Sequence, residues 1–180
     1  MFAPSDERLI ERALDNNKQA WLQLVKRYEG LVYNYGLRML GQREDAQDLL
    51  QDVFLSVFRN LAGWRGEASF KTWLLTIAHH RCIEVYRRRR DHLDMDSVDS
   101  QVSDQDWHHP EQVYQGQQRG NQLVAALQKL PLEQRQVVEL KFFQHLPLAD
   151  IAAQLEVPLS TVKSRLYSAV EKLQRDLEAV

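Results

Sequence analysis

Residues 45–90 read DAQDLLQDVFLSVFRNLAGWRGEASFKTWLLTIAHHRCIEVYRRRR, and this stretch decides the fold. In its first part, apolar residues recur at spacings of three and four, the pattern of a helix with one buried face. They are Ala46, Leu49, Leu50, Val53, Val57 and Leu61. Gly63 follows as a typical helix stop, and the apolar spacing resumes between Phe70 and Tyr86. The stretch therefore predicts two long amphipathic helices joined by a short loop.

The first of these helices carries a second, acidic face. Asp45, Asp48 and Asp52 lie on it, with Gln51 beside them and Leu55 one turn further on. One interpretation is an ordinary solvated face, as for most runs of charge. The other is a docking surface in which apolar side chains at 54 and 55 are rimmed by carboxylates. Such a surface would suit a basic or polar partner protein.

The loop and the second helix are basic and aromatic. Trp64 and Arg65 begin the loop, and the helix ends in four arginines at 87–90. Successive helical residues point about 100 degrees apart, so the four cannot share one face, but they make a dense positive end that suits phosphates. Cations that satisfy a helix C-terminus would explain one or two of them. Aromatic rings beside cations fit the binding of unstacked bases.

The rest of the N-terminal half is also helical in pattern. Ser5 suits the N-cap of a first helix that ends near Asn16. A longer helix follows from about Trp21 to Met39, and Gly41 is a plausible stop. Its aromatic residues are expected in the core, because they keep helical spacing. With no convincing strand alternation anywhere, residues 1–90 are predicted to form a helical bundle.

Charge divides the chain into three parts. The net charge of −2 is the sum of +4 in residues 1–90, −6 in residues 91–110 and zero in residues 111–180. Residues 91–110 lack periodicity and are rich in Asp, Ser and Gln, which predicts a flexible acidic linker. Trp107 within it is unusual and suggests an anchor point. The chain is thus expected to be all-α, with two small helical domains joined by this linker.

The third part, residues 111–180, ends in a pattern typical of a helix-turn-helix. A helix is expected from about Glu111, after Pro110 and as far as Pro131, and another as far as His145. A short helix after Pro147, a turn at 156–159 and a last helix capped by Ser160 follow. Residues at the start of that last helix are placed to read DNA, with a plain helical hairpin as the alternative. They are Thr161, Lys163, Ser164, Arg165, Tyr167 and Ser168.

Composition excludes several classes of protein. A single cysteine, Cys82, rules out an internal disulfide, and with His79 it supplies only two possible ligands, so no zinc site is expected. His108 and His109 fall in the linker. No apolar run is long enough to cross a membrane, and the first residues lack a signal-peptide core. A cytoplasmic protein without cofactor, metal or small-molecule substrate is expected.

The text DLLQDVFLSVF followed by WRGEASFKTWL resembles region 2 of bacterial RNA polymerase sigma factors. The short length and the C-terminal motif place it with the extracytoplasmic-function (ECF, group 4) members of the sigma-70 family. The resemblance spans about 21–90 and 111–177, and implies sigma region 2 in residues 1–90 and region 4 in residues 111–180. It also implies that the acidic helix binds the clamp helices of the largest polymerase subunit. The matching residues are Asp48, Gln51, Asp52 and Leu55.

The same resemblance implies that the loop and the basic helix bind and open the −10 promoter element. The matching residues are Trp64, Arg65, Ser69, Phe70, Lys71, Trp73, His80, Arg87 and Arg88. Housekeeping sigma factors carry a tryptophan pair that wedges the duplex open, and here those positions are Thr76 and Ile77. Weaker melting and stricter promoter choice would follow.

The segment LPLADIAAQLEVPLSTVKSRLYSAVEKL resembles sigma region 4, which binds the −35 element, while the preceding helices meet the polymerase flap. Ser168 stands where the family often has arginine, which puts one DNA contact in doubt. In the family, the linker threads polymerase channels. Family membership also implies control by an anti-sigma factor, often membrane-bound, which covers the DNA-binding and polymerase-binding faces.

Two other functions compete with a sigma factor. A helix-turn-helix regulator with an N-terminal sensor or dimerisation bundle would need neither the acidic face nor the basic, aromatic loop. A nucleic-acid enzyme is disfavoured, because no Asp, Glu and His cluster has acid-base or metal-binding spacing. The sequence therefore predicts a non-enzymatic promoter-recognition subunit.

Overall fold

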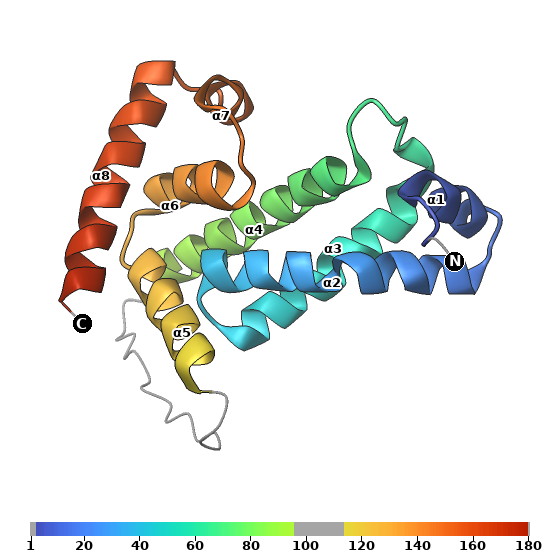
Figure 1. The fold of residues 1–180 in the computed structure, drawn as a ribbon, viewed down its shortest axis with the longest axis horizontal. Coiled ribbons are helices and arrows are strands. Elements are labelled where there is room, and N and C mark those ends of the chain that lie inside the picture. Colours follow the sequence, from blue (N-terminus) through green and yellow to red (C-terminus); the bar gives the residue numbers. More distant parts are fainter. Residues whose placement is uncertain (1–2, 96–113, 180) are drawn as a thin grey trace. The chain divides into compact units, whose positions relative to one another are not determined.

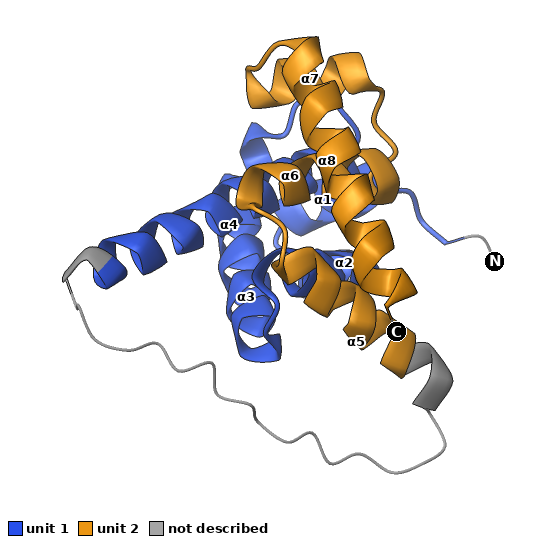
Figure 2. Ribbon diagram, turned by 90° about the vertical axis from the view of Figure 1, so that its left-hand side faces the viewer, with its two compact units in different colours: residues 1–102 blue, residues 103–180 orange. Residues whose placement is uncertain are grey.

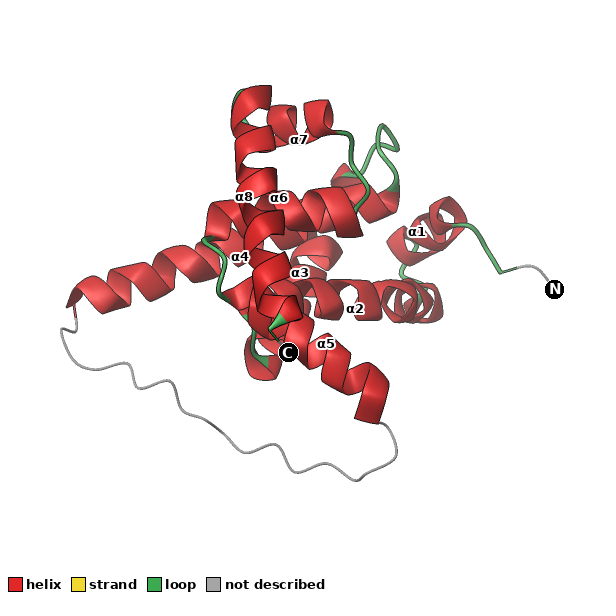
Figure 3. Cartoon of the chain, turned by 60° about the vertical axis from the view of Figure 1, so that its left-hand side comes forward, coloured by secondary structure: helices red, strands yellow, loops and turns green. Residues whose placement is uncertain are grey.

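The structure, a computed structural model, describes residues 3–95 and 114–179 (Figure 1). The chain forms two compact units, an N-terminal unit of residues 1–102 and a C-terminal unit of residues 103–180 (Figure 2). Within the described ranges every regular element is helical and no strand occurs (Figure 3). The expected all-α class is thus confirmed. None of the helices in the described part is long and apolar enough to cross a bilayer.

Four α-helices make up the described part of the N-terminal unit. They are α1 (Asp6–Leu14), α2 (Lys18–Leu40), α3 (Arg43–Asn60) and α4 (Phe70–Met95), with a short 3₁₀ helix at Leu61–Gly63. The side chain of Asn17 caps α2 by accepting a hydrogen bond of 3.0 Å from the Ala20 amide. Gly41 ends α2 in the left-handed conformation at φ 82°.

Helices α2 and α3 approach each other closely at Gly36. A Cβ atom at this position would lie 3.0 Å from the Cα and 3.1 Å from the Cβ of Ala46. Both residues are buried, so their small size is what allows the two backbones to pack at this distance. The aliphatic stripes of α2, α3 and α4 then close around this contact into one core.

Hydrogen bonds and an ion pair connect the helices at the two ends of the bundle. The Asp6 carboxylate accepts hydrogen bonds from the guanidinium of Arg27 and the hydroxyl of Tyr28, which ties α1 to α2. At the other end, Arg89 on α4 pairs with Asp45 in the first turn of α3. One of the four arginines is therefore a structural residue of the bundle.

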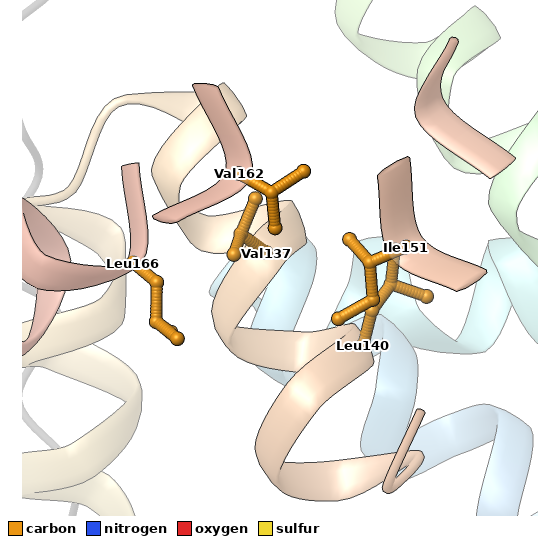
Figure 4. Packing of buried hydrophobic residues seen from close by; sticks show 5 residues of the cluster. All are labelled: Val137, Leu140, Ile151, Val162 and Leu166. Atoms are coloured by element: carbon orange, nitrogen blue, oxygen red, sulfur yellow. The ribbon is translucent and has the colours of Figure 1, made fainter. Parts of the chain in front are cut away.

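The C-terminal unit contains α5 (Tyr114–Gln128), α6 (Leu132–Val138), α7 (Leu148–Leu155) and α8 (Leu159–Glu178). Residues Glu139–Phe143 continue α6 as a π-helix. Helices α7 and α8 meet at a turn in which Glu156 is left-handed, at φ 55°. Buried residues from α6, the π-helix, α7 and α8 hold this helix-turn-helix together (Figure 4). They are Val137, Leu140, Ile151, Val162 and Leu166.

A buried arginine closes the end of α5. Arg135 donates hydrogen bonds to the carbonyl oxygens of Leu127, Gln128 and Leu130, at 2.8, 3.1 and 3.0 Å. The last carbonyls of a helix have no partner within the helix, so these bonds supply donors to carbonyl groups at and just beyond the end of α5. The Leu127 carbonyl also accepts from the Leu130 amide, at 3.1 Å. Arg135 therefore orients α5 against α6.

Several local predictions need correction. Helix α4 runs through Met95, so the first five residues of the predicted linker are helical. Helix α8 begins at Leu159 after Pro158, and Ser160 is inside its first turn rather than at its N-cap. The remaining linker residues, Trp107 among them, and the predicted helix start at Glu111 lie outside the described residues.

Candidate polymerase-binding and promoter-binding surfaces

The predicted docking residues form one exposed stripe on α3. Asp48, Gln51, Asp52 and Leu55 are all exposed, Leu55 by 54%. Their spacing of three and four keeps them on one side of the helix. The stripe, which we call the acidic face, therefore offers carboxylates around an apolar side chain to a partner.

The edge of the acidic face is in contact with α4. Arg81 Nε lies 3.7 Å from Asp52 Oδ2, and Arg81 also donates to Glu84 at 3.1 Å and to the Ser56 hydroxyl at 3.4 Å. Asp52 remains more than half exposed despite this contact. Its carboxylate is thus oriented by the fold and still accessible from outside.

Phe54 does not belong to this surface, which corrects the prediction that it flanks Leu55. It is only 7% exposed, and its ring packs edge-on against Trp21 with centroids 6.2 Å apart. The sequence reasoning missed Phe58 instead, which is 62% exposed and lies three residues after Leu55. The i, i+3 spacing from Leu55 was the signal that could have identified it.

The loop between α3 and α4 is held by short-range hydrogen bonds. The Trp64 indole donates to the Ala68 carbonyl at 3.1 Å, and Gly66 allows the turn with φ 74°. Ser69 accepts a hydrogen bond from the Thr72 amide at 3.1 Å and so caps α4. Between these anchors Arg65 is exposed, and Trp64 is half-buried.

Beyond the loop, the start of α4 divides into exposed and buried positions. Lys71 is exposed and Trp73 is half-buried, so both are accessible to a ligand. Phe70 is only 1% exposed, which corrects the expectation that its ring contacts DNA. Its ring belongs to the core and packs against the inner side of the loop.

The second half of α4 presents cations selectively. His80, Arg87 and Arg88 are exposed, as contact with a nucleic acid would require, whereas Arg89 pairs with Asp45. Arg90, the last of the four arginines, is also exposed. The pairing partner of Arg89 lies 44 residues away, so no local pattern could have identified it.

His79 faces inward next to the exposed His80. Its Nδ1 lies 3.5 Å from the Tyr35 hydroxyl. Burial, with a smaller contribution from His80, lowers the pKa of His79 from its ordinary value. Cys82 is buried on the same helix, and no cluster of three potential metal ligands occurs among the described residues. His108 and His109 lie outside them.

The first turns of α8 carry an exposed polar face. Lys163, Ser164 and Tyr167 are exposed, Tyr167 by 71%, and Ser168 is half-buried; their i, i+1, i+4, i+5 spacing places the four residues together. Thr161 is half-buried beside them.

Arg165 is turned partly away from this face. Its side chain is 24% exposed, and its Nη2 lies 3.7 Å from Oε2 of Glu133 on α6. Leu159, at the start of α8, is exposed and was missed by the sequence reasoning. An exposed lysine, hydroxyls and an aromatic ring at a helix start can contact phosphates and base edges.

Comparison with known proteins matches both units to one family. Residues 24–92 match Sigma-70 region 2, and residues 120–173 match Sigma-70, region 4. The ECF RNA polymerase sigma factor SigE of Mycolicibacterium smegmatis is 33% identical, over 95% of this chain and 68% of SigE. The RNA polymerase sigma factor YlaC of Bacillus subtilis is 33% identical, over 86% of this chain and 90% of YlaC.

Solved structures share the fold. CnrH, solved in complex with the cytosolic domain of CnrY, matches with a TM-score of 0.63 and 24% identity, over 97% of each chain. The sigma factor RpoE from Bartonella quintana, solved with the anti-sigma factor NepR, also has a TM-score of 0.63, with 23% identity over 91% of this chain and 97% of RpoE. The chain therefore belongs to the sigma-70 family of RNA polymerase sigma factors, in its extracytoplasmic-function group.

Proposed function

We propose that this ECF sigma factor binds core RNA polymerase through the acidic face of α3 and directs it to promoters through α4, its preceding loop and α8. The observation that carries the proposal is the separation of two chemistries within the N-terminal unit. Carboxylates and Leu55 are exposed on α3, whereas the loop and α4 combine exposed cations with half-buried tryptophans. A protein that bound only DNA would not need the first surface.

The clamp helices of the largest polymerase subunit are the proposed partner of the acidic face. Asp48, Gln51 and Asp52 would bind cationic and polar groups there, and Leu55 would be buried in the contact. Exposed carboxylates around an apolar centre support this, because interface centres are apolar and their rims are charged. The flap of the polymerase is the proposed partner of the C-terminal unit.

Opening of the −10 element is assigned to the loop and α4. The half-buried rings of Trp64 and Trp73 would stack on unpaired bases, and the exposed cations would hold the phosphate backbone. Those cations are Arg65, Lys71, Arg87 and Arg88. Ser69 and His80 are exposed close to them in sequence and would add polar contacts.

The −35 element is assigned to the start of α8. Lys163 would contact guanine or phosphate, while Thr161, Ser164 and Ser168 would make less selective hydrogen bonds. Tyr167 adds an exposed ring to this face. Arg165 would have to share its guanidinium with Glu133, so its contact is expected to be weaker than that of a free arginine.

Regulation and location follow from the same assignment. We propose that the chain performs no covalent chemistry, since the polymerase would form the RNA bonds, and that it acts in the cytoplasm where that polymerase works. An anti-sigma factor is the proposed regulator. The complex of RpoE with NepR supports this by analogy of fold.

Run-off transcription with purified core polymerase on a pooled promoter library tests the proposal. Transcripts that start at one shared motif, only when this protein is added, are the expected result. Loss of transcripts with Asp48→Lys, but not with Glu11→Lys on the exposed side of α1, would link activity to the acidic face. Failure to bind core polymerase would favour a helix-turn-helix regulator with an N-terminal sensor or dimerisation bundle.

A further inference from the structure

Phe70 is the centre of an aromatic cluster beneath the loop. Its ring centroid lies 5.3 Å from that of Tyr28, 6.3 Å from that of Trp64 and 5.8 Å from that of Trp73. The pairs with Tyr28 and Trp64 are edge-to-face, a favourable arrangement for aromatic rings. Because Phe70 is fully buried and packed against Trp64 and Trp73, a shift of its ring would also displace the rings of both tryptophans.

The hydroxyl group of Tyr28 is itself held by a hydrogen bond. Its hydroxyl donates to the Asp6 carboxylate, which also receives Arg27 Nη1 at 2.5 Å. Arg27 donates further to the Pro4 carbonyl at 2.7 Å, so the N-terminal segment closes around this group. Burial, followed by the hydrogen bond to Asp6, raises the pKa of Tyr28 to about 12. The hydroxyl is therefore protonated and able to donate to Asp6 at any physiological pH.

Helix α1 also reaches the other end of the loop. It contacts the 3₁₀ helix Leu61–Gly63, from which the loop departs, as well as α2. Helix α1 thus supports both ends of the loop at residues 64–69. It supports the start of the loop by direct contact with the 3₁₀ helix, and the end through Tyr28 and Phe70. A loop fixed at both ends presents its side chains with less conformational freedom, which favours binding.

We propose that Tyr28 is a positioning residue for promoter opening, which sets the place of Phe70 and, through it, of the two tryptophans that receive unpaired bases. Asp6 fixes Tyr28 in turn, so α1 acts on a DNA-binding loop to which it contributes no residue. The inference rests on the proposed function of the loop. It extends that function to residues more than 30 positions away in sequence.

The alternative is that the cluster only stabilises the bundle. In that case replacing Tyr28 would lower the free energy of unfolding and weaken every binding activity together. A positioning role instead affects contacts to unpaired −10 bases, while polymerase binding and −35 binding persist. Binding to unpaired −10 bases, to core polymerase and to the −35 element must therefore be measured separately.

Two variants with wild-type core polymerase provide the test. Tyr28→Leu removes the ring, and Tyr28→Phe keeps the ring but removes the hydroxyl. DNA binding would be measured with a promoter obtained from the run-off experiment, made with a mismatched bubble at the −10 element, and with a duplex that carries only the −35 element. We expect Tyr28→Leu to bind the bubble about fivefold more weakly than wild type, the scale of one lost aromatic contact. Tyr28→Phe keeps the ring but loses the bond to Asp6, so its affinity should lie between those of wild type and Tyr28→Leu.

Tyr33→Leu is the matched control, because Tyr33 is half-buried on the same helix and has no part in the cluster of Phe70. The inference is overturned if Tyr28→Leu and Tyr33→Leu bind the bubble equally, or if Tyr28→Leu weakens core, −35 and bubble binding by the same factor. If Tyr28→Leu fails to fold, the bubble affinity of Asp6→Ala is compared with that of Glu7→Ala, a change at an exposed position of the same helix. Equal bubble affinities of these two variants would reject the role of α1. A wild-type protein that does not bind core polymerase would instead refute the proposed function itself.

Discussion

Arg81 on α4 lies against Asp52 on α3, with 3.7 Å between Nε and Oδ2. The pair joins the acidic face to the helix proposed to bind the −10 element. Because Asp52 is more than half exposed, the pair is expected to contribute less than about 1 kcal/mol to stability. Changes at Asp52 should therefore report on binding rather than on folding.

Asp52→Lys is expected to lower the affinity for core polymerase by roughly tenfold or more, because it replaces attraction by repulsion at the interface. The free energy of unfolding should change by less than about 1 kcal/mol. Fluorescence anisotropy with labelled protein and purified core polymerase would measure the affinity, with Glu11→Lys as the surface control. Normal core affinity in Asp52→Lys would remove α3 from the docking surface.

Lys163→Ala is expected to weaken −35 binding without affecting core binding. If Lys163 contacts a phosphate, the slope of log affinity against log salt should fall by about 1. Lys172 lies on the same helix and donates to Gln134, so Lys172→Ala is the control. Identical salt titrations for Lys163→Ala and wild type would place Lys163 outside the interface.

Gly36→Ala and Gly30→Ala should have opposite effects, although both lie within α2. A Cβ at Gly36 meets Ala46 at 3.0 Å, so the variant is expected to lose about 1–3 kcal/mol of unfolding free energy. A Cβ at Gly30 meets nothing within 4 Å, so alanine should stabilise the helix by about 0.5–1 kcal/mol. Urea unfolding measures both. Equal effects would show that the α2–α3 contact is not close-packed.

Arg135→Ala should destabilise the C-terminal unit by about 1–3 kcal/mol, because it removes the guanidinium that donates to the carbonyl groups of Leu127, Gln128 and Leu130 at and just beyond the end of α5. Arg119 is exposed on α5, and Arg119→Ala should be nearly neutral. Thermal unfolding followed by circular dichroism would separate the two. A neutral Arg135→Ala would mean that water satisfies the carbonyls equally well.

Stability should fall as the pH is lowered below about 6.5, the ordinary pKa of histidine. The pKa of His79 is lowered in the folded state, so the unfolded chain binds its proton at a higher pH. Protonation then favours unfolding until the pH falls below the folded pKa. Urea unfolding between pH 5 and pH 8 should show this dependence reduced in His79→Gln and retained in His80→Gln. The same dependence in all three proteins would assign it to other groups.

Much of the fold was open to prediction from local pattern. Apolar residues at helical spacing identified α2, α3 and α8, and the turn before α8 identified the helix-turn-helix. The acidic face followed from the same periodicity, because side chains opposite a buried stripe are exposed. These features depend on neighbours within a few residues, which the sequence displays directly.

Tertiary structure decided which members of each chemical group are accessible. Phe70 is buried although Trp64 and Trp73 beside it are not, and Arg89 is paired although Arg87 and Arg88 are exposed. Exposure at the edge of a helix face is set by the helix that packs there, and the partners come from distant parts of the chain. The sequence by itself therefore determined the helices, the two-part organisation and the family, whereas packing between helices determined which aromatic and cationic side chains remain accessible.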